Sequence, residues 1–505
     1  MPTRLQFARN VTVNWIAMLI GMLVPFFLSP FTVHHLGNVV YGIWILVVSS
    51  VSYFYLLDLG LRNAITSFVS KYHTLGTHEE SKRVVSSAVW IRIAISLVVG
   101  LLAAIVAVAF PHIFSVPPRL WYASRCAILL TALSLAITLC SGVPGAVLAA
   151  LHRYDLLSFV NIFRAFFRAA GFVVLLQHGH GLAALAAWEL VAAIATGAAL
   201  TWLCAKAFPE LRHFMRRPER ETIGKIWNYG AYAFLITMAG AVVTYMDNGI
   251  VGLFLNPIAV TFYAIAGNLI LYSREAIAAM SNTFVPIASG FEAEGRIAQL
   301  GRLLIRGTQA SLLLSLPMAI VLFVRGRTFI GLWMGAEYAQ VSGTVLQILL
   351  LNQLLTTANL TSCGIVYGMG KHKPLAMWAL IEAGVNLLLS ILLVRRVGLY
   401  GVAWGTCIAG VICNLFFWPR YMSKLLQISL PQYLWKAWGV TALAAVPFGI
   451  ACWYQERLWA VNSLPGFFLQ TAAILPLLIL TASLMFWKDV TPRLRARFSR
   501  AWSRA

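Results

Sequence analysis

Long apolar runs separated by short polar turns make up almost the whole chain. Each run can cross the bilayer, because about 20 helical residues span its roughly 30 Å of hydrocarbon. A backbone in lipid must satisfy its own hydrogen bonds, so these runs predict membrane-spanning helices. The predicted spans cover residues 11–33, 40–70, 84–110, 121–150, 155–177, 181–206, 225–254, 258–288, 302–324, 340–368, 374–394, 399–420, 432–452 and 466–487. The pattern therefore predicts an all-α polytopic membrane protein of about 14 transmembrane helices.

Composition supports a bilayer environment and argues against a nucleic-acid partner. The 505 residues are 60% hydrophobic and 11% charged, with a net charge of +22, whereas a soluble domain carries about a quarter charged residues. The positive charge lies in short loops, as expected of a membrane protein. The seven cysteines fall in apolar runs without CxxC spacing, so neither disulfides nor a cysteine metal site is expected.

Loop charges predict the orientation of the chain. One set of loops carries most of the lysines and arginines, including the cluster around residues 206–225 and the tail at 488–505. The opposite loops are expected to hold few cations, namely Arg119, Arg325, Arg327, Arg395, Arg396 and Arg457. Because cytoplasmic loops concentrate positive charge, both termini are predicted to be cytoplasmic.

A polar linker at residues 207–224 divides the first twelve spans into six and six. The expected organisation is an N-terminal lobe at 1–206, a C-terminal lobe at 225–424, two additional helices at 425–487 and a basic tail at 488–505. Short basic loops recur at matched positions, AALHRYD at 149–155 and GMGKHKP at 368–374. Parallel repeats of this kind place a transport site between the lobes, near mid-membrane. The alternative is that apolar helices resemble one another by composition.

Ionisable residues inside predicted spans are the first candidates for function. Each costs a few kcal/mol in the membrane unless it is paired or hydrated. Six arginines and five acids fall there, namely Asp58, Arg62, Arg92, Arg164, Arg168 and Glu189 in the first lobe, and Asp247, Arg274, Glu275, Arg306 and Glu382 in the second.

Arg164 and Arg168 give the sharpest signal. They lie four residues apart, with Asn161 three residues before, so one helix face carries all three. No acid lies nearby in the sequence. A substrate pyrophosphate would supply the missing counter-charge, and arginine offers bidentate donors to phosphate oxygens. The alternative is a structural role, with pairing to Glu189 or snorkelling to the interface.

The other ionisable residues suggest a second phosphate contact and ion coupling. Asp58 and Arg62 lie four apart, and either neutralise each other or leave Arg62 to line a cationic cavity. Arg274 is the second-lobe candidate for phosphate contact. Candidates for coupling to H⁺ or Na⁺ are Asp247, Glu382, Asp58 and Glu189; Asp247 or Glu382 could instead neutralise an arginine of the other lobe. No metal site is expected.

Several motifs resemble one transporter family. The N-terminal third contains a proline-bearing first span, then LG with YGIW, then LLDLGL before a basic loop; the second half contains GKHKP and GLYGVAWGT. Over about its first 420 residues the chain resembles the polysaccharide-transport and Wzx-type O-antigen flippases of the MOP superfamily, to which the MATE transporters also belong.

The resemblance implies a fold, a substrate and a location. It implies two six-helix lobes in a V around a central cavity, with two further helices like those of peptidoglycan-precursor flippases. It implies alternating-access transfer of undecaprenyl-diphosphate-linked oligosaccharide across a bacterial inner membrane, without a cofactor and alongside the glycosyltransferases and glycan polymerase of the same pathway. Relatives use cavity arginines in early spans and the eighth span, where Arg62 and Arg274 match. The first span here has no arginine, and Arg164 and Arg168 would take its place.

Two other functions fit the sequence less well. A MATE-like multidrug or cation antiporter needs acidic cavity residues, and here arginines outnumber acids in the spans. A membrane glycosyltransferase or polymerase needs catalytic groups in large external loops, where only Glu337 and Glu456 are expected. A non-enzymatic flippase is therefore the leading prediction.

Overall fold

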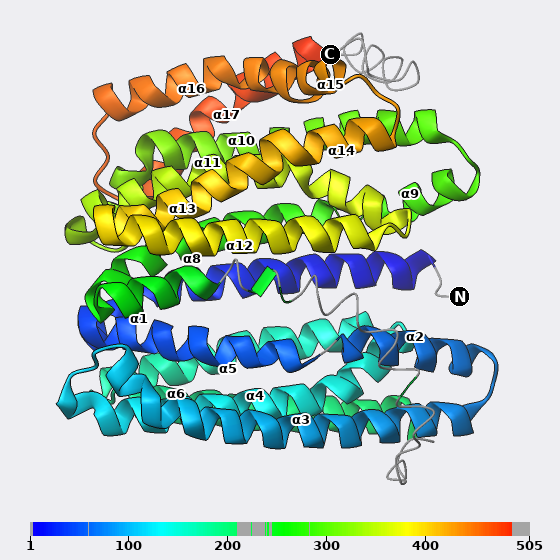
Figure 1. Cartoon of the computed structure of the whole chain (residues 1–505), viewed down its shortest axis with the longest axis vertical. Helices are drawn as coiled ribbons and strands as arrows, with labels where there is room; N and C mark the ends of the chain where they lie inside the picture. Colours follow the sequence, from blue (N-terminus) through cyan, green and yellow to red (C-terminus); the bar gives the residue numbers. More distant parts are fainter. Residues whose placement is uncertain are drawn as a thin grey trace. The chain divides into compact units, whose positions relative to one another are not determined.

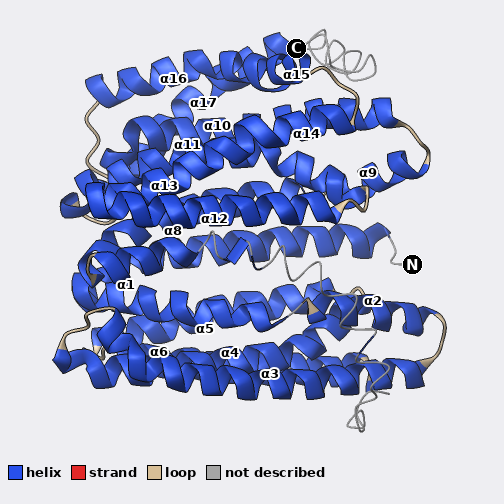
Figure 2. Ribbon diagram, in the orientation of Figure 1, coloured by secondary structure: helices blue, strands red, loops and turns tan. Residues whose placement is uncertain are grey.

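The computed structural model describes residues 4–58, 60–209, 245–281 and 283–486, with isolated positions at 224, 238, 240 and 241. All regular structure in these ranges is helical (Figure 2). Eleven helices there are long and apolar enough to cross a membrane. The protein is therefore an all-α, multi-pass integral membrane protein, as predicted. The predicted seventh span, the 207–224 linker and the 488–505 tail lie mostly outside the described residues, apart from a helical stretch at 245–254.

Apart from the stretch between α6 and α8, the helices follow one another with short connections (Figure 1). Their bounds are α1 Arg4–Ser52, α2 Leu61–Thr74, α3 His78–Ile113, α4 Trp121–Ala150, α5 Tyr154–Gln177, α6 Leu182–Ala207, α8 Pro257–Ser281, α9 Phe284–Ala293, α10 Ile297–Trp333, α11 Ala336–Gly368, α12 His372–Val397, α13 Leu399–Val411, α14 Trp418–Leu425, α15 Leu430–Tyr433, α16 Val440–Leu458 and α17 Leu464–Phe486. Short 3₁₀ or π-helical segments join some of them, namely η1 Tyr53–Asp58, η2 Pro118–Leu120, η4 Ile412–Phe417 and η5 Leu434–Gly439.

The first two predicted spans are one long helix with a kink, followed by a break. α1 contains non-helical backbone at Gly37, between the predicted spans. The second span does not continue as a helix to residue 70, because η1 ends at Asp58 and Gly60 adopts a left-handed conformation (φ 69°) before α2 begins. Glycine takes this conformation without the steric cost of a Cβ. Irregular backbone at membrane depth persists only inside protein or beside water.

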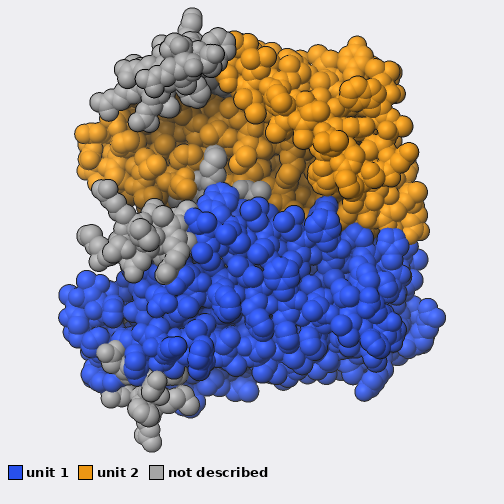
Figure 3. Space-filling view, turned by 180° about the vertical axis from the view of Figure 1, so that it is seen from behind, with its two compact units in different colours: residues 1–264, 376–402 blue, residues 265–375, 403–505 orange. Residues whose placement is uncertain are grey.

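The first compact unit contains residues 1–264 and 376–402 (Figure 3). Its centre is α4, which packs against α3 on one side and α6 on the other, while α1 packs against α5. Residues 245–264 join this unit through α1: Asn248 Nδ2 donates to Ser49 Oγ (3.3 Å) and Thr261 Oγ1 donates to the carbonyl of Asn38 (2.7 Å). The unit therefore divides the chain at places other than the predicted lobe boundaries.

The second compact unit contains residues 265–375 and 403–505. In it α10 packs against α11 and α16, and α16 packs against α17. The pair α16 and α17 corresponds to the two additional helices predicted at the C-terminal end. α10 continues nine residues past the predicted end of its span at 324. Arg325 and Arg327, expected in an external loop, therefore lie within this helix, which corrects the prediction.

Candidate functional site

One face of α5 carries the arginines that the sequence singled out. Arg164 and Arg168 are both half-buried there, and Asn161 is exposed. The Arg164 side chain has no ion-pair or hydrogen-bond partner among the residues that the structure describes. A half-buried guanidinium without a counter-charge costs free energy in a membrane. Whether Arg164 binds an anionic ligand stays a prediction.

Arg168 differs from Arg164 because it has a carboxylate partner. Its Nε forms an ion pair with Oε1 of Glu189 on α6, a carboxylate whose side chain is 12% exposed. The guanidinium also lies 4.8 Å from the ring centre of Phe172. This is the structural alternative that the sequence left open. The role of Arg168 in binding a pyrophosphate remains a prediction, and Glu189 is already engaged as a counter-ion.

Around this pair, α5 and α6 are joined by an aromatic stack and a hydrogen bond. Trp188 on α6 stacks on Phe167 of α5 at 4.9 Å between ring centres, and its Nε1 donates to the Phe167 carbonyl at 3.1 Å. Sequence patterning did not identify these two residues, since aromatic residues are common in spans. Their contacts fix the rotation of α5 relative to α6, and with it the direction of the arginine face.

Asp58 pairs with Arg92 and not with Arg62. Arg92 on α3 is 1% exposed and its guanidinium contacts the Asp58 carboxylate. The break at Gly60 explains the correction: Asp58 belongs to η1 and Arg62 to α2, so the two side chains do not stack on one helix face. Arg62 is exposed. The pairing makes Asp58 a counter-ion of a buried arginine, and leaves Arg62 as a candidate cavity cation.

Asp247 is the most enclosed carboxylate among the candidates for ion coupling. It is 6% exposed, and the Tyr263 hydroxyl on α8 donates a hydrogen bond of 2.6 Å to its Oδ2. The neighbouring Asn248 contacts Ser49 of α1 at 3.3 Å. Tyr263 therefore binds this carboxylate directly, and the neighbouring Asn248 ties the same helical stretch to α1. The sequence identified Asp247 but missed Tyr263 and Ser49, which are distant in the chain.

The remaining candidates lie on other helices. Arg274 on α8 belongs to the second unit and is half-buried without an ion pair among described residues; its neighbour Glu275 is exposed. Glu382 is half-buried on α12, and Arg306 is exposed on α10. Over the described ranges no group of three or more histidine, cysteine, aspartate or glutamate side chains could hold a metal ion.

A fully buried arginine in the second unit was assigned from the sequence to an external loop. Arg325 on α10 donates to Glu456 (3.0 Å) and Gln455 (3.3 Å) of α16 and to Gln470 (2.8 Å) of α17. Its guanidinium lies 4.6 Å from the ring centre of Phe467. We call these five residues the Arg325 cluster. Since every partner comes from α16 or α17, the cluster fastens the two additional helices to α10.

Comparison with known proteins identifies the chain. The profile of the family described as polysaccharide biosynthesis protein matches residues 40–343, more than half of the sequence. This chain belongs to the polysaccharide biosynthesis protein family.

The relatives of this polysaccharide biosynthesis protein have low sequence identity, but they match it over most of its length. It is 22% identical to the uncharacterized membrane protein EpsK of Bacillus subtilis, over 83% of this chain and 84% of that protein. It is 23% identical to the probable low-salt glycan biosynthesis flippase Agl15 of Haloferax volcanii, over 61% of this chain and 63% of that protein.

Solved structures show that the family member has the MOP fold. The lipid II flippase MurJ in an inward closed conformation superposes with a TM-score of 0.75, at 13% identity, over 95% of this chain and 99% of MurJ. Multidrug transporters of the MATE family, in the same superfamily, share the fold. The predicted fold is confirmed, and this fold by itself is common to flippases and drug transporters.

A double-mutant cycle tests the pairing of Arg168 with Glu189 in this polysaccharide biosynthesis protein. Arg168→Met and Glu189→Leu should each lower the free energy of unfolding by about 1–3 kcal/mol, because each leaves a partly buried charge without its partner. The double variant should recover part of that loss, giving a coupling of roughly 0.5–3 kcal/mol. Equilibrium denaturation in micelles provides the measurement.

The exposed pair Arg296 and Glu294 is the control for that cycle. Substitution of both partners there should give a coupling below about 1 kcal/mol, since water screens exposed ion pairs. Strictly additive effects of the Arg168 and Glu189 substitutions would show that the two side chains do not interact. Arg168 would then be, like Arg164, an arginine without a carboxylate partner.

Proposed function

We propose that this protein is a flippase that moves undecaprenyl-diphosphate-linked oligosaccharide, a repeat unit of lipopolysaccharide or exopolysaccharide, across a bacterial inner membrane by alternating access. A diphosphate headgroup with sugars cannot cross hydrocarbon unaided, since each buried charge is costly there. A cationic passage removes that barrier while the lipid tail stays in the bilayer. The family, the glycan flippase Agl15 and the lipid flippase MurJ support this class of substrate.

The observation that carries the proposal is Arg164. A half-buried guanidinium without a carboxylate partner among the described residues is what a diphosphate site requires before its ligand arrives. Arginine donates two parallel hydrogen bonds to phosphate oxygens. Arg62 and Arg274 are the proposed further contacts, one in each half of the chain, with Arg168 and Asn161 beside Arg164 on α5.

Ion coupling and topology complete the proposal. Asp247, enclosed and hydrogen-bonded by Tyr263, is the proposed site at which H⁺ or Na⁺ binding drives the cycle; Glu382 is the second candidate. The distribution of basic loops supports cytoplasmic termini.

The proposed partners are the lipid-linked substrate, membrane lipids, and the glycosyltransferases and polymerase that make and consume the substrate. The proposed role includes no enzymatic step.

A transport assay separates this function from multidrug export, the activity of the MATE relatives. The purified chain is reconstituted into vesicles with an undecaprenyl-diphosphate-linked trisaccharide that carries a fluorophore on its sugar. A membrane-impermeant reductant then reports which leaflet holds the fluorophore. We expect protein-dependent movement of the glycolipid and no movement of ethidium. Ethidium transport without glycolipid movement would contradict the proposal and favour an exporter.

A further inference from the structure

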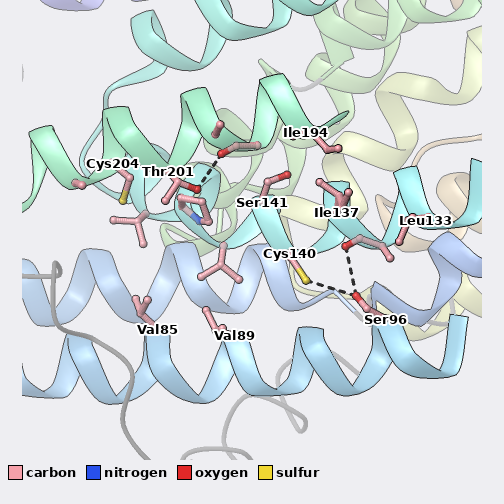
Figure 4. A pocket seen from close by; sticks show the side chains of 17 residues that line it. Val85, Val89, Ser96, Leu133, Ile137, Cys140, Ser141, Ile194, Thr201 and Cys204 are labelled. Atoms are coloured by element: carbon pink, nitrogen blue, oxygen red, sulfur yellow. Dashed lines mark hydrogen bonds between the residues drawn. The ribbon is translucent and has the colours of Figure 1, made fainter. Parts of the chain in front are cut away.

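An apolar groove runs along α4 in the first unit (Figure 4). It lies between α3 and α6, which flank α4, and has a volume of about 770 Å³. That volume is in the range of small-molecule sites, about 300–1,000 Å³. Its side chains come from these three helices alone, and include Val85 and Val89 of α3, Ile137 and Pro144 of α4, and Ile194 and Ala198 of α6.

The few polar side chains in the groove are already hydrogen-bonded within the protein. Ser96 donates to the carbonyl of Ala136 (3.3 Å), Ser141 to that of Thr138 (3.1 Å) and Thr201 to that of Gly197 (2.8 Å). Figure 4 shows Ser96 and Thr201 turned toward these internal partners. A site whose polar groups are satisfied internally and whose walls are apolar favours an apolar occupant over water.

The length of the groove matches one leaflet of the bilayer. Its lining extends from Val85 to Ser96 on α3 and from Ile194 to Ala205 on α6, in each case about 17 Å at about 1.5 Å per helical residue. Half of the roughly 30 Å hydrocarbon core is about 15 Å. Both stripes end near the helix ends that we propose to be cytoplasmic, so the groove spans the depth of the cytoplasmic leaflet.

Lysines lie at that same end. Lys82 is three residues before Val85 and shares its helix face. Its Nζ contacts Glu79 at 2.8 Å, which leaves two of the three ammonium donors. Lys206 follows Ala205 on α6, with its Nζ 5.4 Å from the ring centre of Trp202. Lysines beside an apolar groove at the membrane surface can attract the negative charge of a lipid headgroup.

We propose that this groove binds one acyl chain of an anionic phospholipid of the cytoplasmic leaflet, with its phosphate at Lys82 and Lys206. The placement in that leaflet rests on the orientation proposed above, while the acyl-chain site stands on the groove itself. A partner helix is a poorer fit: a 17 Å length of helix about 10 Å across occupies roughly 1,300 Å³, more than the groove offers. A single chain, in contrast, is enclosed on three sides by α3, α4 and α6.

Photo-crosslinking tests the site directly. The full-length protein is reconstituted into vesicles of phosphatidylethanolamine and phosphatidylglycerol, with a trace of phosphatidylglycerol carrying a diazirine midway along one acyl chain. After illumination, mass spectrometry locates the labelled peptides. We expect labelling concentrated on groove residues of α3, α4 and α6. Filling the groove with Ala198→Phe plus Thr201→Phe should reduce that labelling by about tenfold, since it displaces several buried methylene groups.

Matched variants keep the test decisive. Ala104→Phe adds the same ring at an exposed position of α3 that does not line the groove, and should leave the labelling unchanged. Lys82→Gln and Lys206→Gln should each weaken labelling by about fivefold, whereas Lys371→Gln should not. Labelling spread evenly over all lipid-facing helices, or unchanged when the groove is filled in a variant of normal thermal stability, would overturn the proposal. Because the readout is lipid occupancy, it is independent of glycolipid transport.

Discussion

Replacing Arg325 with alanine should lower the free energy of unfolding by about 3–5 kcal/mol, the usual cost of removing one partner of a buried ion pair. Arg325 is fully buried, and its guanidinium satisfies Glu456, Gln455 and Gln470 at once. The variant would remove the donor to Oε2 of Glu456 and to the amide oxygens of Gln455 and Gln470, and would leave Thr328 as the donor to Oε1 of Glu456. The same loss should free α16 and α17 from α10, so hydrogen exchange in these two helices should rise more than elsewhere. Equilibrium denaturation in micelles and exchange measurements check both effects.

Arg327 on the same helix provides the control. Its side chain is exposed and bonds to Thr344 at 3.1 Å, so Arg327→Ala should change the free energy of unfolding by about 0.5 kcal/mol or less. Equal effects of the two substitutions would show that the Arg325 cluster does not hold α16 and α17 in place. An Arg325→Lys variant should fall between them, because lysine keeps the charge but loses the planar fork.

Arg164→Ala should reduce export of surface glycan by about tenfold or more. Loss of a hydrogen-bonded charge contact costs about 1.5–3 kcal/mol, and every 1.4 kcal/mol is a factor of ten. The double variant Arg164→Ala plus Arg168→Ala should abolish export, and Arg164→Lys should retain only part of it. The measurement is surface glycan in cells that lack their own flippase, with the amount of protein in the membrane determined alongside.

Arg119→Ala is the comparison for Arg164, since Arg119 lies in the short η2 segment rather than on α5. It should leave export unchanged. Normal export from the Arg164 and Arg168 double variant at normal protein level would remove both residues from the substrate path. A loss of export from Arg168→Ala alone needs the stability data on the Glu189 pair before it can be assigned to substrate binding.

The fold was predictable because the membrane restricts the choice. Helix is the structure in which long apolar runs such as 181–206 satisfy their backbone in lipid, and α6 at Leu182–Ala207 agrees within a residue. The second span shows the limit of this reasoning. Hydropathy continues through residues 53–60, so the 3₁₀ segment and the left-handed Gly60 leave no trace in the apolar pattern, although they decide the partner of Asp58.

The sequence showed which charged residues lie in the spans but not how they pair. An intramembrane charge is conspicuous in sequence, so Arg168, Glu189, Asp58 and Asp247 were found. Which charge meets which depends on helix packing between segments that are far apart in the chain, such as Asp58 with Arg92. Arg325 was misplaced for a related reason: hydropathy falls at a charged residue, so the predicted span ended at 324 and the burial by α16 and α17 was invisible.

During biosynthesis, Arg325 is made well before the residues of α16 and α17 that complete its cluster. Glu456 follows Arg325 by 131 residues, and a ribosome that adds about 5–20 residues per second needs roughly 7–26 seconds to reach it. During that interval α10 has entered the membrane while its arginine waits for a partner not yet made. A chain released early, before α16 and α17, would lack every side chain to which this arginine donates.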